Sequence, residues 1–132
     1  MTIENFLYPY ISQEEDYEKG AVIIKEGSRG KWAYLILDGT VKVKKRTPKG
    51  VVTIDSLTEG DIFGEMILWL SAEGTRTASV IADTNVRLGV LDTELFMKEY
   101  ESISPRLKSL IGSLIQRLAS TTQRAVKLAI DK

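Results

Sequence analysis

Arg76 is the residue whose type and setting point most clearly to binding chemistry. It opens the run 76–82, in which small apolar side chains occupy alternate positions. If this run is a strand, one face carries Arg76, Ala78, Val80 and Ala82, and this small apolar face is the inward one. A buried guanidinium is costly without an anionic partner, and its planar fork suits a phosphate better than an ammonium group does. The run therefore predicts an arginine that binds phosphate.

A second stretch, 60–70, offers the other half of a phosphate site. Phe63-Gly64-Glu65 is typical of a turn that leads into a short apolar helical segment. A helix start presents free N–H groups, and the missing side chain of Gly64 lets a ligand approach closely. Glu65 would repel a lone phosphate, but its carboxylate can accept a hydrogen bond from a neighbouring sugar hydroxyl. A phosphate beside a sugar hydroxyl indicates a nucleotide.

Short strands joined by tight turns must position these residues. Glycine-bearing turns separate runs rich in Val, Ile, Thr and aromatic residues, as strands require. The expected strands are 22–25, 32–37, 40–43, 51–57, 77–82 and 86–91. Asp38-Gly39 between two of these runs predicts a hairpin. Because no helical crossovers separate the runs, we expect an antiparallel barrel or sandwich rather than a parallel sheet.

The pattern becomes helical after Asp92. Asp92 can cap a short helix that extends through Glu99, and Ser104-Pro105 then opens a longer helix. The longer helix carries residues alternately four and three apart, namely Leu107, Ile111, Leu114, Leu118, Thr121, Ala125 and Leu128. This spacing is typical of a two-stranded coiled coil and predicts a homodimer through the 107–128 helix. The alternative is a helix that packs this stripe on its own sheets.

The composition excludes several classes of function. The 132 residues include no Cys and no His, which removes disulfides, zinc sites of the Cys/His kind and catalysis by either residue. No nucleophile–base pair can be assembled, so we expect no enzymatic activity and no metal. The 18 basic and 18 acidic residues balance, so the net charge attracts neither nucleic acid nor an acidic membrane. Without a membrane span or a signal peptide, we expect a cytoplasmic location.

These motifs, taken in order, resemble the cyclic nucleotide-binding domain of catabolite-activator regulators, cyclic-nucleotide-dependent kinases and gated channels. The resemblance spans roughly Phe6 to Leu118 and rests on Phe63-Gly64-Glu65, on 76–80 and on the glycine series Gly20, Gly27, Gly39, Gly60 and Gly64. It implies a mainly β fold, an antiparallel jelly-roll barrel with flanking helices and a long C-terminal α-helix. It also implies a division into a barrel over 1–100 and a dimerisation and relay helix over 101–132.

The resemblance further implies the ligand and the residues that hold it. The ligand is cAMP or cGMP, without a further cofactor, and the chain is a regulatory module that relays binding through its C-terminal helix. Glu65 holds the ribose 2′-hydroxyl and Arg76 the cyclic phosphate, while backbone amides near 66–68 complete the phosphate shell. The expected ligand-binding residues are Phe63, Gly64, Glu65, Met66, Ile67, Leu68, Arg76, Thr77 and Ala78. Regulators of this family place a helix-turn-helix beyond the long helix; the chain stops at Lys132, so we expect no direct DNA binding.

Several alternatives stay open. Ile67 stands where the family places a small residue, so the chain could instead be a non-binding interaction module of the same fold. Glu65 and Arg76 could pair with each other. Thr77 is either a ligand contact or an ordinary strand threonine. A basic cluster is interpreted as a solvated strand face or a protected edge rather than a phosphate surface; its members are Lys42, Lys44, Lys45, Arg46 and Lys49.

Overall fold

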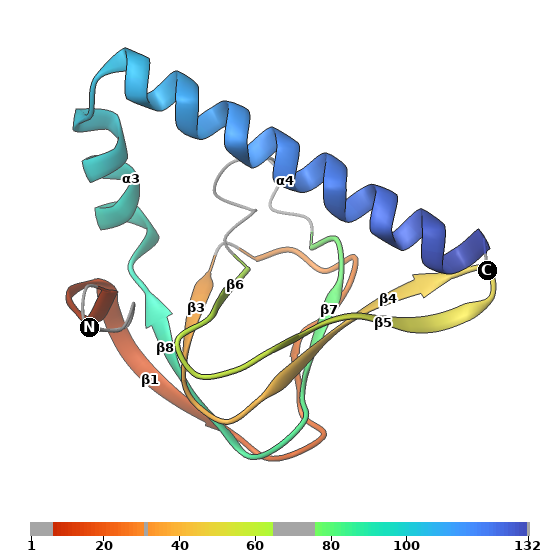
Figure 1. Ribbon diagram of the computed structural model, residues 1–132. Helices are drawn as coiled ribbons and strands as arrows, with labels where there is room; N and C mark the ends of the chain where they lie inside the picture. The colour runs from red at the N-terminus through yellow and green to blue at the C-terminus, as the bar shows by residue number, and fades with distance from the viewer. Residues whose placement is uncertain (1–6, 31, 65–75, 132) are drawn as a thin grey trace.

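Eight strands and two C-terminal helices make up the part of the chain that the structure, a computed structural model, describes: residues 7–30, 32–64 and 76–131 (Figure 1). A short 3-10 helix, η1 (Tyr8–Tyr10), comes first. The strands are β1 (Ile11–Tyr17), β2 (Val22–Ile24), β3 (Ala33–Asp38), β4 (Val41–Thr47), β5 (Gly50–Leu57), β6 (Ile62–Phe63), β7 (Ser79–Ala82) and β8 (Val86–Leu91). The helices are α3 (Thr93–Ser102) and α4 (Pro105–Asp131).

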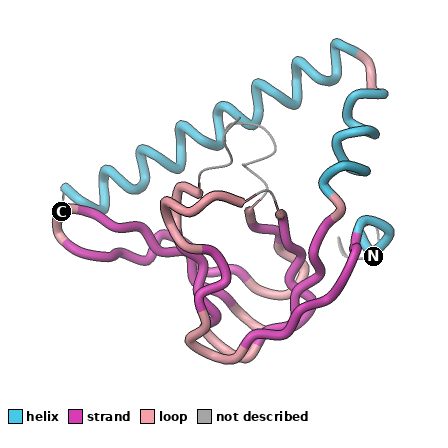
Figure 2. Tube along the Cα trace, turned by 180° about the vertical axis from the view of Figure 1, so that it is seen from behind, coloured by secondary structure: helices cyan, strands magenta, loops and turns pink. Residues whose placement is uncertain are grey.

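The strands form two four-stranded antiparallel sheets, seen from behind in Figure 2. One sheet has the order β1-β8-β3-β6 and the other the order β2-β7-β4-β5. The prediction of a mainly β antiparallel fold with flanking helices is confirmed. The sheets are not closed into a barrel, because in the described ranges β1, β2, β5 and β6 each have a single hydrogen-bonded neighbour. The edge strands β2 and β6 are only three and two residues long, so they offer few backbone N–H and C=O groups that could pair the two sheets into a closed barrel.

β3 is the strand around which the core is built. Leu35 and Ile36 have no solvent exposure, and successive side chains point to opposite faces, so both faces of β3 are covered. On one face, Tyr34 and Ile36 pack with residues of both sheets. On the other face, Ala33 and Leu35 pack against the N-terminal segment, whose contributing residues are Leu7, Tyr10 and Ile11. Burial on both faces makes β3 a rigid support for whatever lies at its ends.

Capping side chains define where both helices begin. The Asp92 carboxylate accepts a hydrogen bond from the Leu95 N–H at 3.1 Å, at the start of α3. The Ser104 hydroxyl accepts one from the Leu107 N–H at 3.2 Å, at the start of α4. Both predicted helix starts are confirmed, and α3 extends to Ser102 rather than ending at Glu99.

The two helices meet at an elbow formed by Ile103 and Ser104. The Tyr100 hydroxyl donates to the Lys108 carbonyl at 3.3 Å, and the Lys108 ammonium forms an ion pair with Glu101 at 3.0 Å. From this elbow, α4 runs along the sandwich, and the C-terminal end of α4 lies beside β5, which it contacts (Figure 1). No helix within the described ranges is long and apolar enough to cross a membrane.

The turn at Asp38-Gly39 does not form the hairpin that the sequence predicts. The strands on either side of it, β3 and β4, lie in different sheets, so the turn carries the chain from one sheet to the other. It packs on the 83–85 segment, where the Asp83 N–H donates to the Thr40 carbonyl at 2.9 Å. Gly39 has a φ of +96°, and a Cβ on it would lie 2.4 Å from the Asn85 carbonyl oxygen.

We expect Gly39→Ala to destabilise the fold through both backbone strain and a steric clash. A left-handed backbone costs a non-glycine residue about 1–2 kcal/mol, and the clash adds to that because a backbone oxygen cannot rotate away. Gly20→Ala is the matched control, since Gly20 has a φ of +91° but nothing within 4 Å of a Cβ. Urea denaturation should show a loss for Gly39→Ala that exceeds the control by about 1 kcal/mol or more. Equal losses would contradict the clash.

Candidate functional site

The side chain of Arg76 is buried between two strand ends. Arg76 is 6% exposed. Its Nη2 donates a hydrogen bond to the Trp32 carbonyl at 2.7 Å, and its Nη1 donates to the Gly64 carbonyl at 3.2 Å. Trp32 immediately precedes β3 and Gly64 immediately follows β6, and these strands run antiparallel with Tyr34 opposite Phe63. The start of β3 and the end of β6 therefore lie side by side, and the guanidinium links them.

The backbone of Arg76 is fixed by the loop that follows β2. The Arg76 N–H donates to the Ser28 carbonyl, and the Gly27 N–H donates to the Arg76 carbonyl, both at 2.8 Å. Glycines leave the space that the guanidinium fills: a Cβ on Gly30 would lie 2.9 Å from Nη2, and one on Gly64 would lie 3.0 Å from Nη1. Gly64 also has a φ of +81°, which an alanine would adopt only under strain.

Within the described residues, Arg76 is a buried cation without a counter-charge. Its guanidinium hydrogen-bonds to neutral carbonyls, and no carboxylate that the structure describes forms an ion pair with it. Burial lowers the pKa of the guanidinium from its ordinary value, while the nearby Tyr34 raises it. An arginine in a protein nonetheless stays protonated at neutral pH. A desolvated cation of this kind provides a binding site for an anion.

Two stacked aromatic rings support this site from the core. Phe63 is 3% exposed, and its ring stacks on that of Tyr34 with centroids 5.1 Å apart. Burial raises the pKa of the Tyr34 hydroxyl, and Glu15 raises it further, so the ring beside Arg76 stays neutral. Phe63 thus places its side chain in the core, while its backbone leads directly to Gly64.

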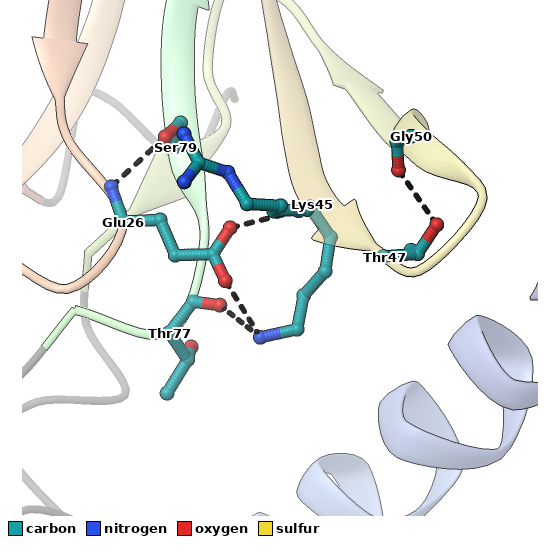
Figure 3. Close-up of polar contacts among 7 residues, drawn as sticks. Glu26, Lys45, Thr47, Gly50, Thr77 and Ser79 are labelled. Carbon is teal, nitrogen blue, oxygen red and sulfur yellow. Dashed lines mark hydrogen bonds and ion pairs between the residues drawn. The ribbon is translucent and has the colours of Figure 1, made fainter.

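The segment after Arg76 is held by a salt bridge that the sequence did not reveal. The Lys45 ammonium donates to the Thr77 carbonyl at 2.6 Å and forms an ion pair with Glu26 at 3.3 Å (Figure 3). In the sequence, Glu26 lies in a glycine-bearing turn between the expected strands 22–25 and 32–37, and Lys45 belongs to the basic cluster. The two residues are 19 positions apart, so no local pattern links them.

The structure brings Gly64 and Arg76 together, as two of the predicted ligand-binding residues. Thr77 is exposed and Ala78 half-buried on the segment that leads into β7. The other predicted residues, Glu65, Met66, Ile67 and Leu68, lie outside the described residues, as does the alternative pairing of Glu65 with Arg76. The contributions of Trp32, Ser28 and Gly27 were missed because they are made by backbone groups, which residue types do not reveal.

The chain is 41% identical over 80 residues to the cAMP-dependent protein kinase regulatory subunit of Schizosaccharomyces pombe, which covers 61% of this chain and 18% of that protein. It is 36% identical over 104 residues to potassium/sodium hyperpolarization-activated cyclic nucleotide-gated channel 1 of Homo sapiens, covering 79% of this chain and 11% of that protein. The chain therefore spans about a fifth or less of these curated relatives.

The fold is also found in solved structures. The EAL enzyme Bd1971 in its cAMP-bound form superposes with a TM-score of 0.74 and 30% identity over 90% of this chain and 30% of that chain. A family model described as "Cyclic nucleotide-binding domain" matches residues 14–102, which include the loop after β2, the end of β6 and Arg76. The chain belongs to the cyclic nucleotide-binding domain family.

Proposed function

We propose that this chain binds a cyclic mononucleotide, cAMP or cGMP, with the cyclic phosphate on Arg76. The observation that carries the proposal is the buried guanidinium, which hydrogen-bonds to neutral carbonyls and to no described carboxylate. A cyclic phosphate carries one negative charge shared by two non-bridging oxygens, which the two-pronged fork of an arginine can bind together. Bd1971, which shares the fold, is described in both cAMP-bound and cGMP-bound forms, and this supports the ligand class.

Glu65 and the amides near 66–68 complete the proposed site. The family resemblance assigns the ribose 2′-hydroxyl to Glu65 and further phosphate hydrogen bonds to those amides. Their location in the sequence supports the assignment, because Glu65 directly follows Gly64, whose carbonyl accepts a hydrogen bond from Arg76. Gly64 and Phe63 contribute a rigid frame, and Thr77 and Ala78 form the segment that leads from Arg76 into β7.

The proposed role is regulatory rather than catalytic. The chain has no Cys or His, and the described part of its site offers a buried cation but no nucleophile paired with a base that could cleave a phosphodiester. The strand orders of the two sheets support the finer description of the sandwich as a jelly roll. The alternative function is a non-binding interaction module of the same fold, which Ile67 favours. A cytoplasmic location stays a prediction.

We also propose that two copies of the chain dimerise through α4 and that α4 relays ligand binding. Residues 101–132 then form the dimerisation and relay segment. Support comes from the outer face of α4, where large apolar side chains are exposed: Leu107 by 44%, Leu114 by 54%, Leu118 by 53% and Leu128 by 64%. Ile111 of the predicted stripe is not part of this exposed face: it is half-buried, and among the described side chains of α4 it shares its face with Lys108, Gly112, Ile115 and Ala119. An exposed leucine stripe at coiled-coil spacing is a dimerisation surface of the expected kind.

Arg76→Ala and Glu65→Gln should weaken nucleotide binding to different extents. Loss of Arg76 leaves the phosphate charge unpaired in a buried site, which costs about 2–5 kcal/mol of binding free energy. Glu65→Gln retains an acceptor for the ribose hydroxyl, so its cost should be about 1–2 kcal/mol. Isothermal titration calorimetry with cAMP and cGMP in parallel measures both effects.

Arg87→Ala is the matched control for this experiment. Arg87 is also an arginine on the sandwich, but its side chain is 57% exposed and pairs with Asp16 at the β1–β8 edge. Its removal should leave nucleotide affinity unchanged. Near-zero effects of both Arg76→Ala and Glu65→Gln would contradict the site assignment. Absence of binding heat from a folded wild-type chain would instead favour the non-binding module.

The double substitution Leu114→Glu, Leu118→Glu should convert a dimer into a monomer. Two carboxylates placed on the seam would be buried against their counterparts in the partner helix, which is strongly unfavourable. Sedimentation at tens of micromolar protein measures the change. Ser109→Glu, Gln116→Glu is the matched control, because both residues are exposed on α4 but lie off the seam. A monomeric wild type, or a dimeric Leu114→Glu, Leu118→Glu variant, would exclude α4 as the interface.

A further inference from the structure

The ladder between β4 and β7 stops short of Arg76. Its last pair is Lys44 with Ser79, although β4 itself continues to Thr47. If the same register continued, Arg46 would lie opposite Thr77, and Arg76 would lie opposite Thr47, the last residue of β4. The ladder does not extend to that pair, and Arg76 instead turns its side chain toward the carbonyls at the ends of β3 and β6.

Side chains replace the missing ladder pair. One oxygen of the Glu26 carboxylate accepts a hydrogen bond from the Arg46 N–H at 2.9 Å, and the other pairs with the Lys45 ammonium at 3.3 Å. The same ammonium donates to the Thr77 carbonyl at 2.6 Å. Glu26 and Lys45, here called the clamp, thus bridge β4 to the segment of Arg76 at the place where the backbone no longer does so (Figure 3).

The clamp also holds the loop that fixes the backbone of Arg76. The Glu26 N–H donates to the Ser79 hydroxyl at 2.9 Å. The next two residues, Gly27 and Ser28, form the backbone hydrogen bonds on either side of Arg76. Glu26 is therefore tied through its carboxylate to β4 and through its backbone to the start of β7, with Arg76 held in between.

The clamp is charged but electrically neutral as a pair. Burial alone would raise the pKa of Glu26, but the hydrogen bonds from the Arg46 amide and from Lys45 outweigh it and hold this pKa below its ordinary value. Glu26 is thus ionised at neutral pH, and its charge offsets that of Lys45. Because the two opposite charges lie 3.3 Å apart, their fields largely cancel at longer distance, so the clamp as a pair attracts an anion only weakly.

We propose that Glu26 and Lys45 are positioning residues that keep Arg76 out of the β4–β7 ladder and aimed at the anion site. The effect on ligand affinity rests on the proposed function, whereas the effect on Arg76 itself does not. The direction in which Glu26→Gln changes anion affinity distinguishes the proposal from a purely electrostatic effect. Glu26→Gln removes a negative charge and leaves Lys45 uncompensated, so electrostatics alone would strengthen binding of an anion, whereas loss of positioning weakens it.

The first experiment needs no ligand. Hydrogen exchange of the Arg76 guanidinium N–H groups is followed by ¹⁵N-edited NMR, and the signals are assigned by their loss in Arg76→Lys. We expect slow exchange in the wild type, because Arg76 is buried and donates to two carbonyls, and exchange faster by about tenfold or more in Glu26→Gln. Asp83→Asn is the matched control, since Asp83 pairs with Lys42 on the same strand β4 but does not contact the loop that holds Arg76.

The second experiment measures cAMP and cGMP affinity calorimetrically in the same variants. Glu26→Gln should weaken binding by about tenfold, as expected when contacting groups are coupled, and Asp83→Asn should not. In an Arg76→Lys background, Glu26→Gln should have no further effect, because the residue that it positions is gone. A merely structural role would lower thermal stability while leaving both exchange and affinity of the folded protein unchanged.

The outcomes separate the clamp from the proposed function. Unchanged exchange, or tighter nucleotide binding by folded Glu26→Gln, would overturn the clamp. Faster exchange in a protein that binds neither nucleotide would support the clamp and reject the proposed function. Lys45→Met, which removes both ammonium contacts but keeps the side-chain length, serves as the second variant if Glu26→Gln does not fold. It must speed guanidinium exchange in the same way, and normal exchange would again overturn the proposal.

Discussion

The arrangement of this molecule depends on one interaction, the hydrogen bonding of a buried guanidinium to the backbone carbonyls around it. Arg76 receives partial compensation from the carbonyls of Trp32 and Gly64, and its backbone is held by the loop after β2. Such dipoles offset only part of the cost of burying a charge, so the site is most stable with an anion present. Segments from four parts of the sequence have to converge to build this environment, and both sheets contribute to it.

The sandwich makes that convergence possible because its central strand cannot move. β3 is buried on both faces, pairs with β6 and β8, and begins directly after Trp32. Through Tyr34 stacked on Phe63, the end of β6 is held at a fixed distance from the start of β3. The carbonyls that face Arg76 are therefore placed by the most rigid part of the core.

Residue patterns predicted the strands and helix starts well, and the tertiary relations poorly. The run 86–91 is a strand in which the apolar residues Val86, Leu88 and Val90 alternate with Arg87 and Gly89, and Asp92 and Ser104 cap helices through local contacts. β1 was not among the expected strands, because most of its residues are polar or acidic and its only described neighbour is β8. The hairpin at Asp38-Gly39 was wrong because turn chemistry specifies a reversal but not which sheet the next strand joins. The burial of Arg76 is confirmed, but not for the expected reason, because β7 begins only at Ser79 and strand alternation does not extend to Arg76. Its carbonyl partners could not be predicted, since every residue type has a carbonyl.

The elbow between α3 and α4 makes the last helix a mechanical lever. α4 has 27 residues, about 40 Å of rigid rod, so each degree of rotation at Ile103 and Ser104 displaces the far end by about 0.7 Å. Non-bonded contact is lost within about an ångström of added separation. A tilt of only a few degrees would therefore be enough to separate α4 from β5, which it contacts. Because of the length of α4, a small change in the angle between the two helices would become a displacement of ångströms at the end of α4 opposite the elbow.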